Sequence, residues 1–270
     1  MSIKVLKTRL DEAGKVLDKI DDVLQVHPNR LRNDAGLSIK SSLNARSELS
    51  HWSTLIDTRV SVSNVLAALD TTVDPDGLVV LSGVKVKFQH ARFMLVQSYL
   101  TAAWSLADSM VPVAARILCP ASFGLNSDPA NGPKLSSFLG DKSKAHSPAP
   151  LFHAFPSTFG WPVALLYSLR NHFVHDGASV DALDVFVGPS SAHAFRLSAD
   201  GWDRIVQRAK RYGVDDSDHR EGGAWLTNPK DDLRKVFAEC EPIFDQALGS
   251  LFGAACRTLA AHVAFVFGED

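Results

Sequence analysis

The chain has 270 residues, 46% of them hydrophobic and 21% charged, and a formal net charge of −2. This length and apolar content allow a full hydrophobic core without disulfides, and the near-neutral charge excludes a protein-wide basic field, so any nucleic-acid contact must be local. Three cysteines, Cys119, Cys240 and Cys256, contain no CxxC pair, which excludes a common zinc framework and suits a reducing, cytoplasmic location.

The N-terminal part of the chain is predicted to be helical. Charges interrupt the sequence from Lys4 onward, which argues against a signal peptide. A second helix is expected over residues 37–69, followed by a loop at residues 71–77. Within the first helix, from Ser2 to Val26, apolar residues recur every three or four positions, at Leu6, Leu10, Ala13, Leu17, Ile20 and Leu24.

The middle of the chain is predicted to hold a long central helix over residues 83–119, with a kink at Pro112. Residues 120–156 are rich in Pro, Ser, Gly and Asn, and we expect a loop that lids a neighbouring cleft. The helix pattern consists of Val84, Phe88, Ala91, Leu95, Tyr99, Ala102 and Leu106, and its basic residues Lys85, Lys87, His90 and Arg92 are expected to face solvent.

The segment from Tyr167 to Gly177 carries the residues with the clearest chemistry. An apolar run over residues 163–169 leads into Arg170 and then His175, and the run predicts a helix from Ser157 or Pro162 to His175. RNA cleavage requires a group that moves a proton to or from the reacting oxygens, which suits a histidine, and a cation that neutralises charge on the phosphate, which suits an arginine. Arg170 and His175 are therefore candidate catalytic residues.

Helix geometry sets a condition on this pair. Five residues at about 100° each separate Arg170 from His175 by roughly 140° around a regular helix, whereas Asn171 and His175 share a face. The length of the arginine side chain, an end to the helix near Asp176, or a second copy of the motif would allow the two groups to converge.

The segment Arg170-Asn171-His172-Phe173-Val174-His175 resembles the Arg-x4-6-His signature of the HEPN family. The resemblance implies a helical bundle that cleaves RNA without a metal or other cofactor, with Arg170 and His175 catalytic and Asn171 and His172 positioning the reacting groups. It also implies a homodimer whose two motifs form one cleft, a possible antitoxin or regulatory partner, and a role as a toxin or an antiviral defence effector. Gly177 stands where some HEPN toxins carry a tyrosine that the partner modifies, which argues against that regulation.

The C-terminal part is predicted to begin with a β-hairpin formed by residues 184–187 and 194–197. A short helix is expected from Ser198 to Tyr212 and a last helix after an Asn228-Pro229 cap, with a kink at Pro242. The short helix carries Arg204, Arg208, Lys210 and Arg211, which a solvated face explains, although they could also bind phosphates; the last helix should bury Leu233, Val236, Phe237, Cys240, Phe244, Leu248 and Phe252.

These patterns predict a mainly α fold with a small β-hairpin, as a single domain over residues 1–270, and the resemblance implies that the fold is an HEPN-like helical bundle. N-terminal helices would occupy residues 1–70, and the bundle that bears the motif residues 78–268. The expected function is metal-independent RNA endonuclease, with RNA as substrate and no membrane contact, because polar residues interrupt the apolar stretch at residues 247–268. The alternatives are a non-catalytic module that binds a nucleotide or a protein, and a structural adaptor in which the motif is coincidental.

Overall fold

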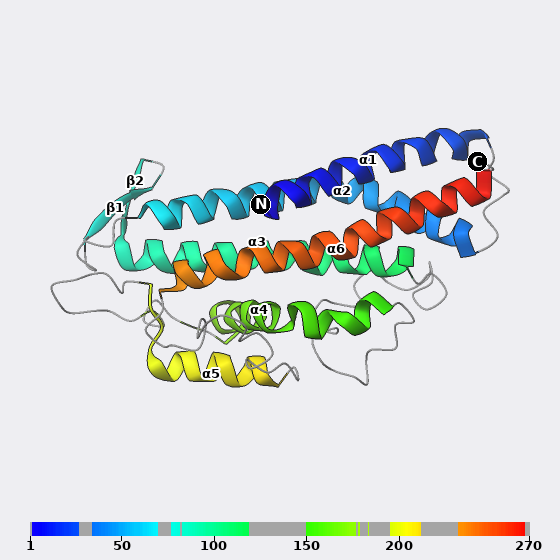
Figure 1. Ribbon diagram of the computed structural model, residues 1–270. Helices are drawn as coiled ribbons and strands as arrows, with labels where there is room; N and C mark the ends of the chain where they lie inside the picture. The colour runs from blue at the N-terminus through cyan, green and yellow to red at the C-terminus, as the bar shows by residue number, and fades with distance from the viewer. Residues whose placement is uncertain are drawn as a thin grey trace. The chain divides into compact units, whose positions relative to one another are not determined.

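The computed structural model describes residues 2–26, 34–69, 77–81, 83–118, 150–176, 178, 183, 195–211 and 232–267. Over these residues the protein is mainly helical, with one small two-stranded sheet, as the sequence predicts (Figure 1). The elements are α1 (Ser2–Val26), α2 (Asp34–Ala68), β1 (Leu78–Leu81), β2 (Val84–Lys87), α3 (Phe88–Leu118), α4 (Pro150–Val174), α5 (Ala199–Lys210) and α6 (Leu233–Phe267).

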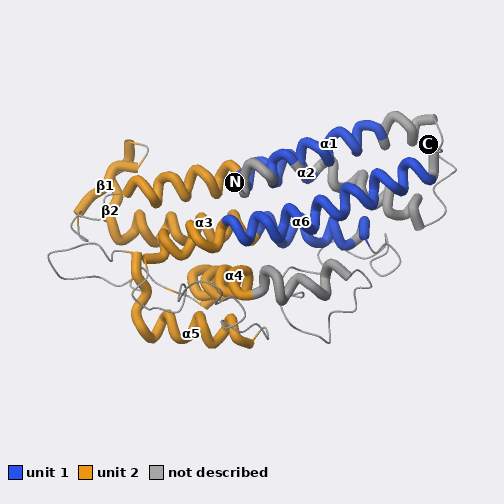
Figure 2. Tube along the Cα trace, in the orientation of Figure 1, with its two compact units in different colours: residues 1–56, 105–159, 242–270 blue, residues 57–104, 160–241 orange. Residues whose placement is uncertain are grey.

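The chain divides into two compact units that share several helices (Figure 2). Unit 1 comprises residues 1–56, 105–159 and 242–270, and unit 2 comprises residues 57–104 and 160–241. The whole Arg170 to His175 motif therefore lies in unit 2.

Unit 1 contains α1 and the first part of α2. Leu6, Leu10, Ala13 and Leu17 are buried, which confirms the apolar pattern of α1 wherever its side chains are described; Ile20 and Leu24 lie outside them. In the same unit Trp52 of α2 meets Phe252 of α6 edge-on, with ring centroids 5.2 Å apart. Edge-to-face packing of this kind adds stabilisation beyond the buried area alone.

The described hairpin lies before α3, where the sequence pattern predicts helix, so that prediction is wrong over residues 84–87. β1 and β2 are antiparallel, with Val79 opposite Val86 and Val80 opposite Lys85. Gly83 in the turn has a φ of 82°, a left-handed conformation that glycine adopts without strain. The alternating valines and lysines of β2 favour a strand, and the tight turn lets that strand pair with β1.

Of the hairpin predicted at residues 184–197, the structure describes a single antiparallel bridge between Leu183 and Leu197. Residues 184–194, which would form its strands and turn, lie outside the described residues.

Helix α3 begins at Phe88 and continues through Pro112. Phe88, Ala91, Tyr99, Ala102 and Leu106 are buried as the pattern predicts, but Arg92 is also fully buried, so its assignment to a solvated face is wrong. The Arg92 guanidinium donates a hydrogen bond from Nη2 to the carbonyl oxygen of Leu183, 3.0 Å away. This contact gives the buried charge one of the polar partners that it requires.

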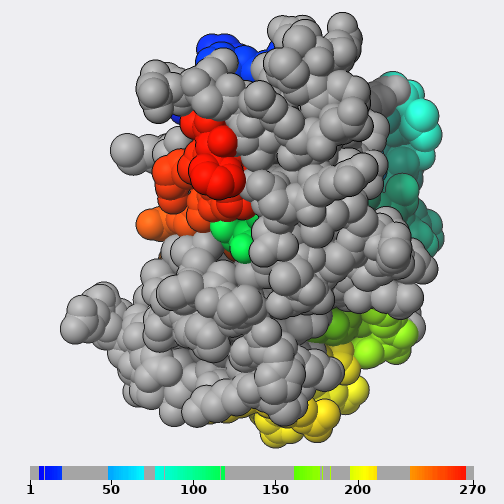
Figure 3. Space-filling view, turned by 90° about the vertical axis from the view of Figure 1, so that its right-hand side faces the viewer, coloured from blue at the N-terminus to red at the C-terminus, as the bar shows by residue number. Residues whose placement is uncertain are grey.

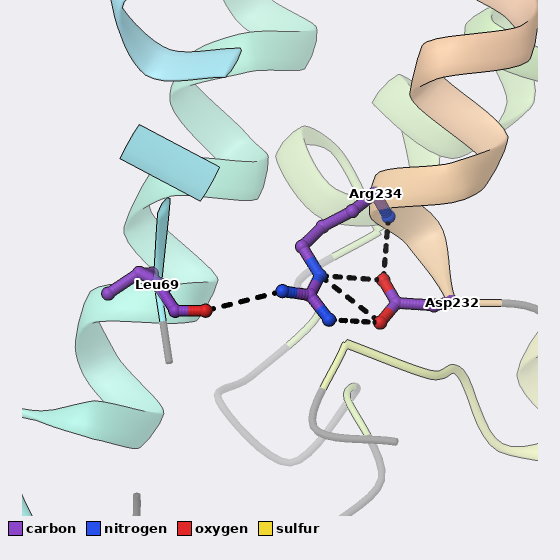
Figure 4. A network of polar contacts seen from close by, with 3 residues as sticks. All are labelled: Leu69, Asp232 and Arg234. Carbon is purple, nitrogen blue, oxygen red and sulfur yellow. Dashed lines mark hydrogen bonds and ion pairs between the residues drawn. The ribbon is translucent and has the colours of Figure 1, made fainter. Parts of the chain in front are cut away.

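Helix α6 begins at Leu233, so residues 228–229 are not its N-terminal cap. Asp232 has that role: its Oδ1 accepts a hydrogen bond of 2.8 Å from the backbone N–H of Arg234. The Arg234 side chain also contacts the Asp232 carboxylate and donates to the carbonyl oxygen of Leu69 at the end of α2, 3.3 Å away (Figure 4). These bonds hold the start of α6 against the end of α2 inside unit 2.

The α6 residues that were expected to face inward are all buried. This confirms the prediction for Leu233, Val236, Phe237, Cys240, Phe244, Leu248 and Phe252. By length and composition alone, Leu233–Phe265 is also apolar enough to cross a membrane, a test that the core helix of a soluble protein also passes.

Unit 2 has its own core around α3. Tyr99 stacks on Phe237 of α6, with ring centroids 4.4 Å apart. Arg59 of α2 is 1% exposed. Its Nε lies 3.0 Å from Oε1 of Glu241, in an ion pair whose atoms are not aligned as a hydrogen bond. These contacts join α2, α3 and α6 within unit 2.

Candidate active site at the end of α4

The second half of α4 is anchored in the core of unit 2. The ring of Tyr167 lies 4.6 Å from that of Trp104 on α3, and Phe173 packs against Phe93 at 5.8 Å. Gln97 on α3 donates a hydrogen bond of 3.3 Å to the carbonyl oxygen of Phe173. The helix starts at Pro150, earlier than predicted, and its buried face comprises Trp161, Val163, Ala164, Leu165, Leu166, Leu169 and Phe173.

The helix ends within the motif, as the sequence predicts. α4 closes at Val174, and the carbonyl oxygen of Asn171 accepts hydrogen bonds from the backbone N–H groups of both His175 and Asp176, each 2.9 Å long. The His175 side chain is exposed just beyond the last helical turn. The imidazole is thus accessible to a ligand while its backbone is held by the helix.

Arg170 and Asn171 are in direct contact. Nη1 of the arginine donates a hydrogen bond of 3.1 Å to Oδ1 of the asparagine, and both side chains are half-buried. Asn171 and His175 are four residues apart and lie on the same helix face. The hydrogen bond therefore holds the guanidinium beside Asn171, the residue that shares a helix face with His175 by its spacing.

His172 lies near a second charged pair, formed by Asp176 and by Arg208 of α5. Oδ2 of Asp176 lies 4.0 Å from Nδ1 of His172 and 2.7 Å from Nη2 of Arg208. The first distance is too long for a hydrogen bond, whereas the second is that of a strong charge-assisted one. The described parts of α4 and α5 adjoin one another on the protein surface (Figure 3).

Burial lowers the pKa of His172 below its ordinary value of 6.5. The carboxylate of Asp176 opposes this shift, while the guanidinium groups of Arg208 and Arg204 add to it. His172 is consequently neutral at pH 7, so one of its ring nitrogens can accept a hydrogen bond.

The site thus contains two pairs: Arg170 with Asn171, and Arg208 with Asp176. Among the described residues, Arg170 and His175 make no direct polar contact with each other. Arg208 is the residue that reasoning from the sequence did not assign to the site, because it lies far along the chain and only the packing of α5 brings it to Asp176.

In the described part of the chain, no three His, Cys, Asp or Glu side chains are grouped so that they could hold a metal ion. The chemistry available at the described site is accordingly that of two imidazoles, two arginines, an amide and a carboxylate.

Comparison with known proteins returns no relative: no family model, curated protein or solved structure matches this chain.

Proposed function

We propose that the protein is a metal-independent RNA endonuclease of the HEPN type, with its site at the end of α4. The hydrogen bond from Arg170 to Asn171 is the observation that carries the proposal, because it holds the guanidinium beside the residue that shares a helix face with His175. A permanently charged arginine and an exposed histidine on one face are the groups that this chemistry needs.

The proposed reaction is an internal transesterification of RNA. The 2′-oxygen attacks the adjacent phosphorus and loses its proton, the bond from phosphorus to the 5′-oxygen breaks, and the 5′-oxygen takes up a proton. A 2′,3′-cyclic phosphate and a 5′-hydroxyl result. His175 transfers a proton in one of these two steps, and the same group in a second copy of the motif would serve the other.

Arg170 stabilises the negative charge that accumulates on the phosphate oxygens in the transition state. Asn171 orients Arg170 through the 3.1 Å hydrogen bond. The neutral imidazole of His172 positions the ribose by a hydrogen bond. A homodimer would bring two motifs to one cleft, and a toxin or antiviral role, with a partner that restrains it, is the biological setting in which such an activity fits.

The test is cleavage of a mixed pool of single-stranded RNA and tRNA in EDTA. We expect the wild type to cut, and His175→Ala and Arg170→Ala each to lose activity by a factor of about 10² or more, the usual scale for a proton-transfer group or a charge-stabilising donor. His90→Ala, at an exposed histidine of α3, and Arg257→Ala, at an exposed arginine of α6, are the matched controls and should cut normally.

Three results would count against the proposal. They are absence of cleavage by the wild type, cleavage that both site variants retain, or equal losses in the control variants.

The second candidate function is a module that binds a nucleotide or a protein without catalysis. The pairing of Arg208 with Asp176 favours it, because the charges of the cluster are partly neutralised before any ligand binds. It predicts RNA or nucleotide binding with no cut product.

A further inference from the structure

Helix α5 presents a row of arginines beside the motif. Its buried side comprises Gly201, Trp202, Ile205 and Ala209. Arg204, Arg208 and Arg211 are spaced at i, i+4 and i+7, so they lie along one side of the helix, next to that buried stripe. At a rise of about 1.5 Å per residue, this row is about 10 Å long.

The row begins at the candidate site. Nη2 of Arg208 is 2.7 Å from Oδ2 of Asp176, and Arg204 is close enough to His172 to influence its titration. Arg204 and Arg211 are exposed, and neither side chain forms an ion pair with another described residue. The cationic row is therefore continuous with the end of α4 and open to a ligand.

Asp176 leaves most of the donors of Arg208 available. A guanidinium has five N–H donors, and the contact with Asp176 involves Nη2. A phosphate can therefore approach Arg208 without displacing the carboxylate. Like charges at i,i+4 slightly destabilise a helix, and a polyanion that lies along the row would remove that repulsion.

The attraction of basic residues to the end of a helix explains part of this arrangement. Arg208 and Lys210 lie in the last turn of α5, where the helix dipole favours cations. Arg204 lies a full turn earlier and gains little from the dipole, yet it faces the same side as Arg208. Alignment with the motif is what distinguishes the row from an ordinary basic helix end.

We infer that Arg204, Arg208 and Arg211 bind successive phosphates of the RNA strand that enters the site at the end of α4. This inference rests on the proposed ribonuclease function and identifies the substrate as a single strand held by its backbone. Phosphate contacts of this kind fix the position of a strand without reading its bases. The row would set where the strand is cut relative to its bound end.

The test measures the affinity of a labelled single-stranded RNA across a range of salt concentrations. It uses full-length protein that carries His175→Ala, so that the RNA stays intact. Adding Arg204→Gln and Arg211→Gln should weaken binding and reduce the slope of log Kd against log salt by about 1.4, or about 0.7 for each lost phosphate contact. Arg204→Lys with Arg211→Lys keeps both charges and should keep the slope.

The control replaces two exposed cations away from the row, as Lys15→Gln with Arg257→Gln, and should bind as the parent does. An unchanged affinity and slope in the Arg204 and Arg211 glutamine variant would overturn the inference, as would no RNA binding by the parent. Cleavage by the protein that retains His175 is measured separately. Binding through the row without cleavage would support the inference and refute the ribonuclease, whereas cleavage with an unaffected slope would do the reverse.

Discussion

At the scale of single residues, the candidate site depends on how each polar group is partnered. Arg170 donates to the side chain of Asn171, its direct neighbour, so this pair is encoded locally. Arg208 of α5 instead forms an ion pair with Asp176, which follows the end of α4. His172 is half-buried between these groups and remains neutral at pH 7 because burial penalises its charged form more than Asp176 favours it.

The lowered pKa of His172 predicts a pH dependence of stability. The unfolded chain binds a proton at about 6.5, while the folded protein does so only at lower pH. Below pH 6.5 the unfolded state therefore holds more protons, and the free energy of unfolding falls until the folded pKa is passed. Above pH 6.5 this residue contributes no pH dependence.

Urea unfolding of wild type and His172→Gln, from about pH 7.5 down to about pH 5, measures this contribution. The stability of the wild type should decline more steeply with acidification than that of the variant. His90→Gln, which changes an exposed histidine, should follow the wild type. Parallel pH profiles for wild type and His172→Gln would contradict the prediction.

At the scale of elements, α5 is short and depends on its cap and its buried stripe. Ser198 has an extended backbone, with φ −57° and ψ 153°, and its hydroxyl accepts a hydrogen bond of 3.1 Å from the N–H of Gly201. Trp202, Ile205 and Ala209 then bury one side. Because an isolated helix of this length is marginal in water, the cap and the packing together set the position of the arginine row.

Replacing the cap tests this account. Ser198→Ala should lower the free energy of unfolding by about 1 kcal/mol, because the N–H of Gly201 loses its acceptor at the start of the helix. Ser198→Asn restores an acceptor and should keep most of that stability. Urea unfolding gives the values, and a Ser198→Ala variant as stable as the wild type would show that the cap contributes nothing measurable.

At the scale of the whole molecule, each chain carries the candidate site at the end of α4, within unit 2. The proposed reaction uses two proton-transfer groups, and a symmetric dimer would provide both by placing two motifs at a shared cleft. Sites of this kind can combine residues from two different chains.

Mixing two inactive variants tests the shared cleft. Arg170→Ala and His175→Ala, each inactive alone, should regain part of the RNA cleavage when their subunits exchange, because a mixed dimer can join Arg170 of one chain to His175 of the other. Sedimentation should show a dimer. Exchange without any recovered cleavage would mean that Arg170 of one chain and one His175 of the other do not suffice for cleavage, and a monomer that cleaves RNA would exclude the shared cleft.

Much of the helical framework could be predicted from the sequence, because the spacing of apolar residues along a helix is a local property. The buried faces of α1 and α6 and the end of α4 follow from that spacing and from helix-end chemistry. The prediction of a helix over residues 84–87 was wrong. The alternating valines and lysines there also fit the start of a helix pattern, and it is pairing with β1 that makes them a strand.

What the sequence by itself determined, then, is the position of most of the helices, the apolar faces of α1 and α6, and the grouping of Arg170, Asn171, His172 and His175 at the end of one helix. Only the tertiary structure decided that Arg92 is buried against Leu183 and that Arg208 reaches Asp176. The reason is physical: periodicity reflects the geometry of one helix, whereas the partner of a charged side chain depends on which distant segment packs beside it.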